Sequence, residues 1–118
     1  MTRFLLATDS VHATAAGCDY LGDRIGEDDA VIVLTVLEDD GSERERDAAD
    51  ALNVATVRLP GAVETERREG DPVETILDAA RGGADEIVLV AAGTDGVGST
   101  TRAVLGAADR PVIVVGPA

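Results

Sequence analysis

Three glycines lie close together near the end of the chain, and three hydroxyl-bearing residues follow them directly. The glycines are Gly93, Gly96 and Gly98, and the hydroxyl-bearing residues are Ser99, Thr100 and Thr101. A strand that leads through glycines into a helix can hold an anion, because its backbone approaches the ligand closely and the free N–H groups of the helix start point at it. The same residues can instead form only a tight turn, with the hydroxyl groups as helix caps. The pattern therefore indicates an anion site and leaves the plain turn open.

A second candidate is Asp9, which directly follows a short apolar run at residues 3–8. Its carboxylate can cap the helix that comes next, or it can contact a ligand at the end of the strand. His12 lies one turn further on and is interpreted as a surface residue rather than a base, while Cys18 falls on the apolar stripe and is expected in the core. One His and one Cys assemble no recognisable nucleophile–base set, which predicts a protein without enzymatic activity.

The composition limits the partners of this protein. Of 118 residues, 23 are acidic and 10 are basic, which gives a net charge of -13, and every basic residue is Arg. A chain this acidic is repelled by nucleic acid and by anionic membranes. Acid enrichment without Lys is typical of proteins that work in molar salt, where the ions screen self-repulsion. The apolar content of 45% excludes a disordered acidic chain.

A lone cysteine and a lone histidine exclude an internal disulfide, a multi-cysteine metal site and a histidine cluster. The sequence enters its first strand pattern without a basic and apolar leader, and no apolar run approaches the roughly 18 residues of a membrane span. We therefore expect a cytoplasmic protein with no metal ligands of its own, which binds neither nucleic acid nor membrane.

Short apolar runs and helical stripes alternate along the whole chain. Strands are expected at residues 3–8, 30–37, 62–68, 87–92 and 111–115, and helices at residues 11–25, 43–57 and 72–81 and after Gly98. The third helix should begin with Asp71 as its N-cap and Pro72 as its first residue. This order predicts a single α/β domain over residues 1–118, with a parallel sheet and right-handed crossovers. Ligands bind such sheets beyond the carboxyl ends of the strands, which is where Asp9 and the glycine loop fall.

The apolar spacing also predicts which helical residues face the sheet. They are Val11, Ala15, Cys18, Leu21 and Ile25 in the first helix, Ala48, Leu52 and Ala55 in the second, Val73, Ile76, Leu77 and Ala80 in the third, and Thr101, Val104, Leu105 and Ala108 in the fourth.

Four segments resemble the universal stress protein (UspA) family. The stretch GSTTRAVLGAADRPVIVV is similar to the C-terminal signature of that family, with Gly98-Ser99, Val104-Leu105, Ala108 and Pro111-Val112 at the signature positions. The segments LLATDSV, VIVLTVLE and EGDPVETILDAARGGADEIVLVAAG resemble its first strand, its second strand, and its Gly-Asp-Pro helix with the fourth strand. The four segments stand in the family's order and cover nearly the whole chain.

The resemblance implies an open five-stranded parallel sheet in the order 3-2-1-4-5, with helices on both faces, and a homodimer. It also implies a site for ATP, with Mg²⁺, in which Asp9 contacts adenosine and Val36 meets adenine through its backbone. The phosphates would be held by Gly93, Gly96, Gly98, Ser99 and Thr100, which match parts of the family's glycine motif.

One departure from the family leaves two functions open. Only Val97 separates Gly96 from Gly98, where the nucleotide-binding pattern has nine residues. The first hypothesis is a non-enzymatic, dimeric stress-response domain that binds ATP or another adenine nucleotide. The alternative is a dimeric interaction module of the same fold that binds no nucleotide because its phosphate loop is short; a weak nucleotide hydrolase is a third hypothesis. In each case the apolar strand from Pro111 to Val115 lies at a sheet edge and is expected to pair with its copy in an antiparallel dimer.

Overall fold

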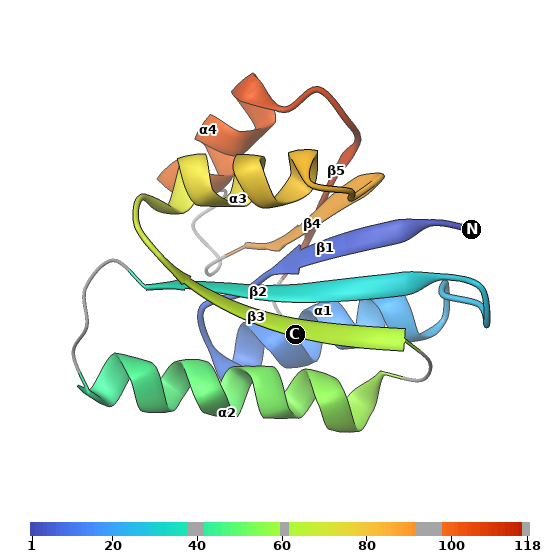
Figure 1. Cartoon of the computed structure of the whole chain (residues 1–118), viewed down its shortest axis with the longest axis horizontal. Helices are drawn as coiled ribbons and strands as arrows, with labels where there is room; N and C mark the ends of the chain where they lie inside the picture. Colours follow the sequence, from blue (N-terminus) through green and yellow to red (C-terminus); the bar gives the residue numbers. More distant parts are fainter. Residues whose placement is uncertain (38–41, 60–61, 92–97, 117–118) are drawn as a thin grey trace.

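The computed structural model describes residues 1–37, 42–59, 62–91 and 98–116, which form five strands and four helices in strict alternation. The strands are β1 (Arg3–Ala7), β2 (Ala30–Leu37), β3 (Ala62–Glu69), β4 (Glu86–Val90) and β5 (Val112–Val115). The helices are α1 (Val11–Gly22), α2 (Ser42–Arg58), α3 (Pro72–Arg81) and α4 (Ser99–Ala107). All strands pair in parallel in the order β3-β2-β1-β4-β5. The expected fold class is therefore confirmed (Figure 1).

Helices cover both faces of the sheet, with α1 and α2 on one face and α3 and α4 on the other (Figure 1). Each face has its own apolar cluster, because successive side chains of a strand point to opposite faces. In β1, Leu5 and Ala7 pack with α3 and α4, whereas Phe4 and Leu6 pack with α1 and α2. This double burial explains why the central strands read as unbroken apolar runs.

Two residues predicted on inward faces lie on the surface instead. Val11 is 40% exposed at the start of α1, and Leu105 is 45% exposed in α4. Both predictions were wrong. Val11 is the first residue of α1 and lies at its exposed end. In α4, a helix of nine residues, Thr101 and Val104 already fill the narrow stripe that faces the sheet. The other boundaries agree to within a few residues, except that Ala92 of the predicted fourth strand lies outside the described residues.

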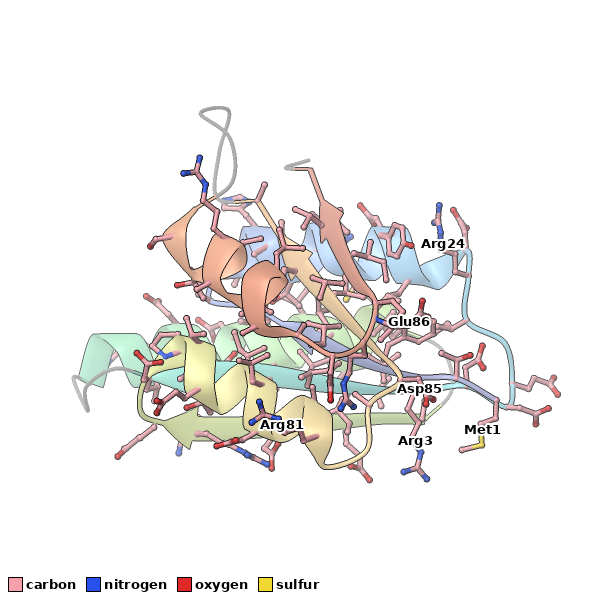
Figure 2. The ribbon with its side chains drawn as sticks, turned by 90° about the horizontal axis from the view of Figure 1, so that it is seen from above. Met1, Arg3, Arg24, Arg81, Asp85 and Glu86 are labelled. Carbon is pink, nitrogen blue, oxygen red and sulfur yellow. The ribbon has the colours of Figure 1, made fainter. Side chains whose placement is uncertain are left out.

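Side chains close the amino-terminal edge of the sheet. The Arg3 N–H donates to Asp85 Oδ2 at 2.9 Å, and the Asp85 N–H donates to the Arg3 carbonyl at 2.7 Å, which ties the start of β1 to the segment before β4 (Figure 2). Asp29 does the same between β1 and β2, since its Oδ1 accepts from the Thr2 N–H at 2.8 Å. Asp29 and Asp85 therefore stabilise the amino-terminal edge of the sheet.

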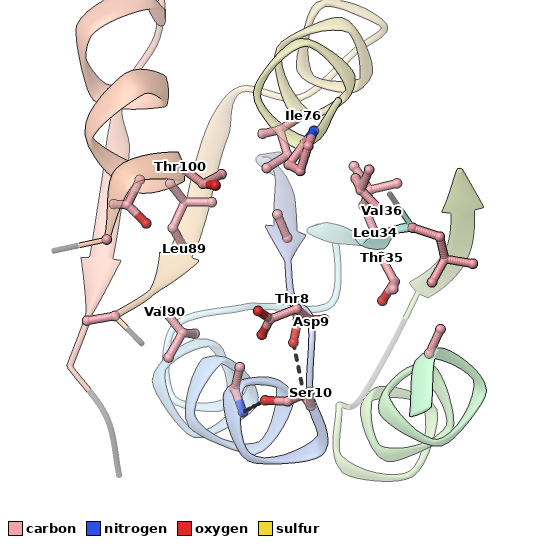
Figure 3. A pocket seen from close by; sticks show the side chains of 18 of the residues that line it. Thr8, Asp9, Ser10, Leu34, Thr35, Val36, Ile76, Leu89, Val90 and Thr100 are labelled. Atoms are coloured by element: carbon pink, nitrogen blue, oxygen red, sulfur yellow. Dashed lines mark hydrogen bonds between the residues drawn. The ribbon is translucent and has the colours of Figure 1, made fainter. Parts of the chain in front are cut away.

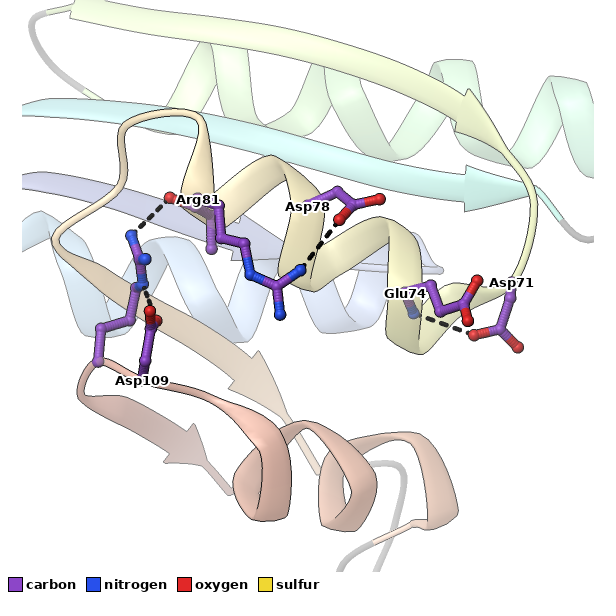
Figure 4. A network of polar contacts seen from close by, with 7 residues as sticks. Asp71, Glu74, Asp78, Arg81 and Asp109 are labelled. Atoms are coloured by element: carbon purple, nitrogen blue, oxygen red, sulfur yellow. Dashed lines mark hydrogen bonds and ion pairs between the residues drawn. The ribbon is translucent and has the colours of Figure 1, made fainter.

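Polar contacts also hold α3 at both ends (Figure 4). Asp71 caps its start by accepting from the Glu74 N–H at 3.0 Å, and Pro72 is its first residue, which confirms the prediction from sequence. At its end, the Arg110 guanidinium donates to the carbonyls of Ala80 and Ala84, both at 2.6 Å. No helix in the described part of the chain is long and apolar enough to cross a membrane.

We expect the stability provided by Asp29 to be lost in acid. Hydrogen bonds from the Gly26 and Thr2 N–H groups hold the pKa of the Asp29 carboxyl below its ordinary value of 3.8. Because the folded pKa is lowered, the stabilisation is complete above the unfolded pKa and disappears as the pH falls through the folded value. In thermal unfolding, the gap between wild type and Asp29→Asn should stay constant above about pH 4 and shrink below it.

The matched control is Asp28→Asn, at the exposed neighbouring position. It should melt at nearly the same temperature as wild type, because Asp28 accepts none of the hydrogen bonds that Asp29 accepts. A gap for Asp29→Asn that widens in acid would contradict the assigned hydrogen bonds.

Candidate functional site

A pocket of about 930 Å³ opens at the carboxyl-terminal edge of the sheet. It lies beyond the ends of β1, β2 and β4. In the sheet β1 lies between β2 and β4, so the chain builds the sheet outward from β1 in one direction through β2 and in the other through β4. This reversal of strand order is the usual place for a ligand in an open α/β sheet. The lining includes Ala7, Thr8, Asp9, Ser10, Thr35, Val36, Asp47, Ile76, Val90, Gly98, Ser99 and Thr100.

Asp9 lies in the pocket and is not the cap of α1. The cap is Ser10, whose side-chain oxygen accepts from the Ala13 N–H at 3.1 Å (Figure 3). Among the described residues Asp9 accepts no hydrogen bond, and its carboxylate is exposed. Of its two interpretations from sequence, the cap was wrong, because the next residue already fills that position. The contact with a ligand stays a prediction.

A small hydroxyl network fixes the backbone around Asp9. The hydroxyl groups of Thr8 and Thr14 are hydrogen-bonded to each other at 2.8 Å, and the Thr14 hydroxyl donates to the Ser10 carbonyl at 2.8 Å. Both threonines are buried. The turn that carries Asp9 is thus anchored to β1 and to α1, so the carboxylate is presented to the pocket by a rigid backbone.

The end of β2 supplies part of the pocket wall, next to α3. Val36 is half-buried against the cluster that contains Ile76, and both residues line the pocket. Thr35 is 3% exposed, and its hydroxyl has no hydrogen-bond partner among the described residues. Sequence reasoning missed Thr35, although it is the one polar residue in the apolar run AVIVLTVL, and such an interruption of a buried strand is a usable signal.

The start of α4 faces the same space. Its N-cap is Gly98, which has no side chain to cap the helix, and the first hydrogen bond along α4 runs from Arg102 N–H to the Gly98 carbonyl. The preceding N–H groups of Ser99, Thr100 and Thr101 belong to the first turn, which in any helix has no internal acceptors. Gly98, Ser99 and Thr100 therefore come together with Asp9 and Val36 in one pocket, whereas Gly93 and Gly96 lie outside the described residues.

Acidic side chains set the charge of the pocket. Asp9 from β1–α1 and Asp47 from α2 line it, and its described lining contains no arginine. His12 also reaches the lining from the exposed surface of α1. Nowhere in the described part of the chain do three or more His, Cys, Asp or Glu side chains gather in a way that could hold a metal ion.

Cys18 takes no part in the site. It lies in the core on the α1 and α2 face, as predicted, and burial raises the pKa of its thiol to about 11. The thiol is therefore protonated at neutral pH and is a poor nucleophile.

This chain is similar to known proteins in both sequence and fold. Residues 1–116 match the model of the universal stress protein family. The hypothetical protein MJ0577 aligns with a TM-score of 0.83 at 19% identity, covering 99% of this chain and 96% of that chain. A universal stress protein in complex with cAMP aligns with a TM-score of 0.79 at 18% identity, covering 99% and 98%. A universal stress protein from Archaeoglobus fulgidus aligns with a TM-score of 0.72 at 19% identity, covering 98% of each chain. No curated protein sequence matches this chain.

Proposed function

Since this chain belongs to the universal stress protein family, we propose that it is a non-enzymatic, dimeric regulatory domain that binds an adenine nucleotide at the carboxyl edge of its sheet. The observation that carries the proposal is the pocket, which gathers Asp9, Val36 and the start of α4 around about 930 Å³ of space. That volume is in the range of pockets that enclose ligands of nucleotide size.

Each part of the nucleotide has a matching surface in the pocket. The adenine ring would lie against the apolar end of β2 at Val36 and Ile76, and the Asp9 carboxylate would accept hydrogen bonds from the ribose hydroxyls. A phosphate would lie at Gly98, Ser99 and Thr100, where free N–H groups and the helix dipole favour an anion. A structural neighbour of the same family binds cAMP, which supports an adenine nucleotide as the ligand class.

Calorimetric titration with adenosine, AMP, cAMP and ATP, the last with and without Mg²⁺, tests this function. Asp9→Ala should weaken adenosine and AMP binding by about 10-fold or more, because it removes a charge-assisted hydrogen bond. Asp28→Ala, at the opposite edge of the sheet, is the matched control and should bind as wild type does. Absence of binding by folded wild-type protein would exclude the nucleotide and leave a same-fold interaction module as the function.

The same experiment addresses catalysis. We expect bound ATP to remain intact over hours, because no cluster that could hold a metal ion is found among the described residues, and the pocket lining that the structure describes contains no arginine to stabilise the charge of a phosphoryl transfer. Steady release of ADP, reduced in Asp9→Ala, would point instead to a nucleotide hydrolase.

A dimer through β5 is the second part of the proposal. The strand is apolar, lies at the edge of the sheet, and keeps all four side chains only half-buried in the single chain. The carbonyls of Pro111 and Val115 accept from β4, so Val112 and Val114 turn their backbone groups to the open edge. An open apolar edge of this kind invites pairing with a second copy.

We expect Val114→Pro to weaken the dimer by about 10- to 100-fold, because the change removes one backbone donor from each copy in a two-fold contact. Sedimentation equilibrium would measure the dissociation constant. Val114→Thr keeps both the N–H group and the β-branched shape, and it should dimerise as wild type does. A wild-type protein that is monomeric at micromolar concentration, or a dimer that is indifferent to Val114→Pro, would rule out this interface.

A further inference from the structure

Thr35 has a buried hydroxyl group for which the described part of the protein supplies no hydrogen-bond partner. Its side chain is 3% exposed, it lines the pocket, and its hydroxyl has no partner among the described residues. A buried hydroxyl without a hydrogen bond is unfavourable, and most such groups in native proteins find a partner. In Figure 3 this hydroxyl points away from Val36 and Ile76. Because the hydroxyl oxygen is itself buried, a ligand in the pocket would supply the partner once the Thr35 side chain turns toward it.

The nearby threonine hydroxyls are already satisfied. The Thr14 hydroxyl donates to the Ser10 carbonyl at 2.8 Å, and the Thr8 hydroxyl donates to the Thr14 oxygen at 2.8 Å. Of Thr8, Thr14 and Thr35, only Thr35 therefore has a hydroxyl group that is left to bind a ligand. As a hydroxyl can both donate and accept, it suits a nucleoside, which carries hydroxyl groups and ring nitrogens.

The charges of the pocket limit how much phosphate such a ligand carries. Asp9 and Asp47 place two carboxylates on the lining, and no arginine of the described residues balances them there. The start of α4 offers one first turn of N–H groups, enough to hold one phosphate group. Each further phosphate would add negative charge beside the carboxylates without gaining a cationic partner among the described lining residues.

Building on the proposed adenine site, we propose that the pocket selects an adenine ligand of low charge, a nucleoside or a nucleoside monophosphate, and that the Thr35 hydroxyl hydrogen-bonds to it. The selectivity comes from the acidic lining, which penalises a triphosphate. Thr35 provides a contact at a buried position of the pocket lining, where a hydrogen bond is less weakened by competition with water.

Calorimetry without divalent cations, with adenosine, AMP, ADP and ATP at low and at molar salt, tests the selectivity. We expect AMP to bind at least about 10-fold more tightly than ATP at low salt, with the gap narrowing in molar salt because ions screen the repulsion. Asp47→Asn should reduce the ratio of the ATP and AMP dissociation constants about 3-fold at low salt, because it removes one of the two negative charges of the lining. ATP binding as tightly as AMP at low salt overturns the selectivity while leaving the proposed adenine site intact.

A second set of variants tests the Thr35 contact. Thr35→Val keeps the shape of the side chain and should weaken AMP and adenosine binding by about 10-fold, while Thr35→Ser should restore most of the affinity. Without ligand, Thr35→Val should melt at a higher temperature than wild type, because it removes an unpartnered buried hydroxyl. Unchanged affinity in Thr35→Val, or a lower melting temperature of its ligand-free form, overturns the contact. Failure of every adenine ligand to bind folded wild-type protein refutes the proposed function, and with it this inference.

Discussion

Replacing Leu6 with alanine is expected to lower the free energy of unfolding by about 3 kcal/mol. Leu6 has no exposed surface, lies in the middle strand of the sheet, and packs in the cluster beneath α1 and α2. Removing its side chain leaves a cavity between β1 and α1 that the surrounding residues cannot fully close. Since a domain of this kind is stable by only about 5–15 kcal/mol, chemical denaturation should detect the loss easily.

Leu105→Ala is the matched control for Leu6→Ala. The same chemical change is made in α4, at a side chain that is 45% exposed. It should cost no more than about 0.5 kcal/mol, as surface substitutions usually do. Equal losses for the two variants would show that Leu105 packs inward after all, as its spacing in the sequence predicts.

Gly17→Val is expected to destabilise the protein by about 3 kcal/mol through overpacking. A Cβ atom at Gly17 would lie 2.6 Å from Leu6 Cδ1 and 3.0 Å from Leu6 Cδ2. In an ordinary helix the change from Gly to Val stabilises the helix by roughly a few tenths of a kcal/mol through helix propensity. The clash with Leu6 is larger than this gain, so the variant is expected to be less stable than wild type. The glycine thus lets α1 lie close against β1, which positions the turn that carries Asp9.

Two further variants separate crowding from other causes. Gly22→Val, at the last residue of the same helix, meets no atom within 4 Å of the added Cβ and should be close to neutral. The double variant Leu6→Ala with Gly17→Val should be more stable than the sum of the two losses predicts, because the new side chain fills the cavity left by Leu6. Simple additivity in this double-mutant cycle would mean that the two residues do not share a space.

The sequence predicted the fold more fully than it predicted the site. Strands such as β4 show a continuous apolar run, at residues 87–90, and α3 has both a capping Asp71 and a Pro72 at its first position. These signals are local, since they depend on residues a few positions apart. Leu105 marks the limit of such reasoning, because a stripe of apolar residues tells which residues are close to the sheet but not how wide the buried face of a short helix is.

The site residues that sequence proposed come together only in part within the described chain. Asp9, Val36, Gly98, Ser99 and Thr100 line one pocket. Sequence reasoning could place these residues at the correct edge because parallel strands bring their carboxyl ends to one side. It could have marked Thr35 as the one polar residue of a buried strand, but it could not show that the hydroxyl lacks a partner among the described residues, because that depends on which distant segments surround it.

What the sequence by itself determined was the order of the elements, the parallel sheet, and the strand that leads through a glycine loop to the start of α4. These follow from periodicity, capping residues and a signature that resembles one family, all of which act over short distances along the chain. The tertiary structure alone decided that Ser10 rather than Asp9 caps α1. It also decided that Asp9 and Asp47 share a pocket with Thr35, whose hydroxyl finds no partner in the described part of the chain. The reason is physical: the partner and the charge environment of a side chain are set by folding, which brings residues from separate strands and helices within contact distance.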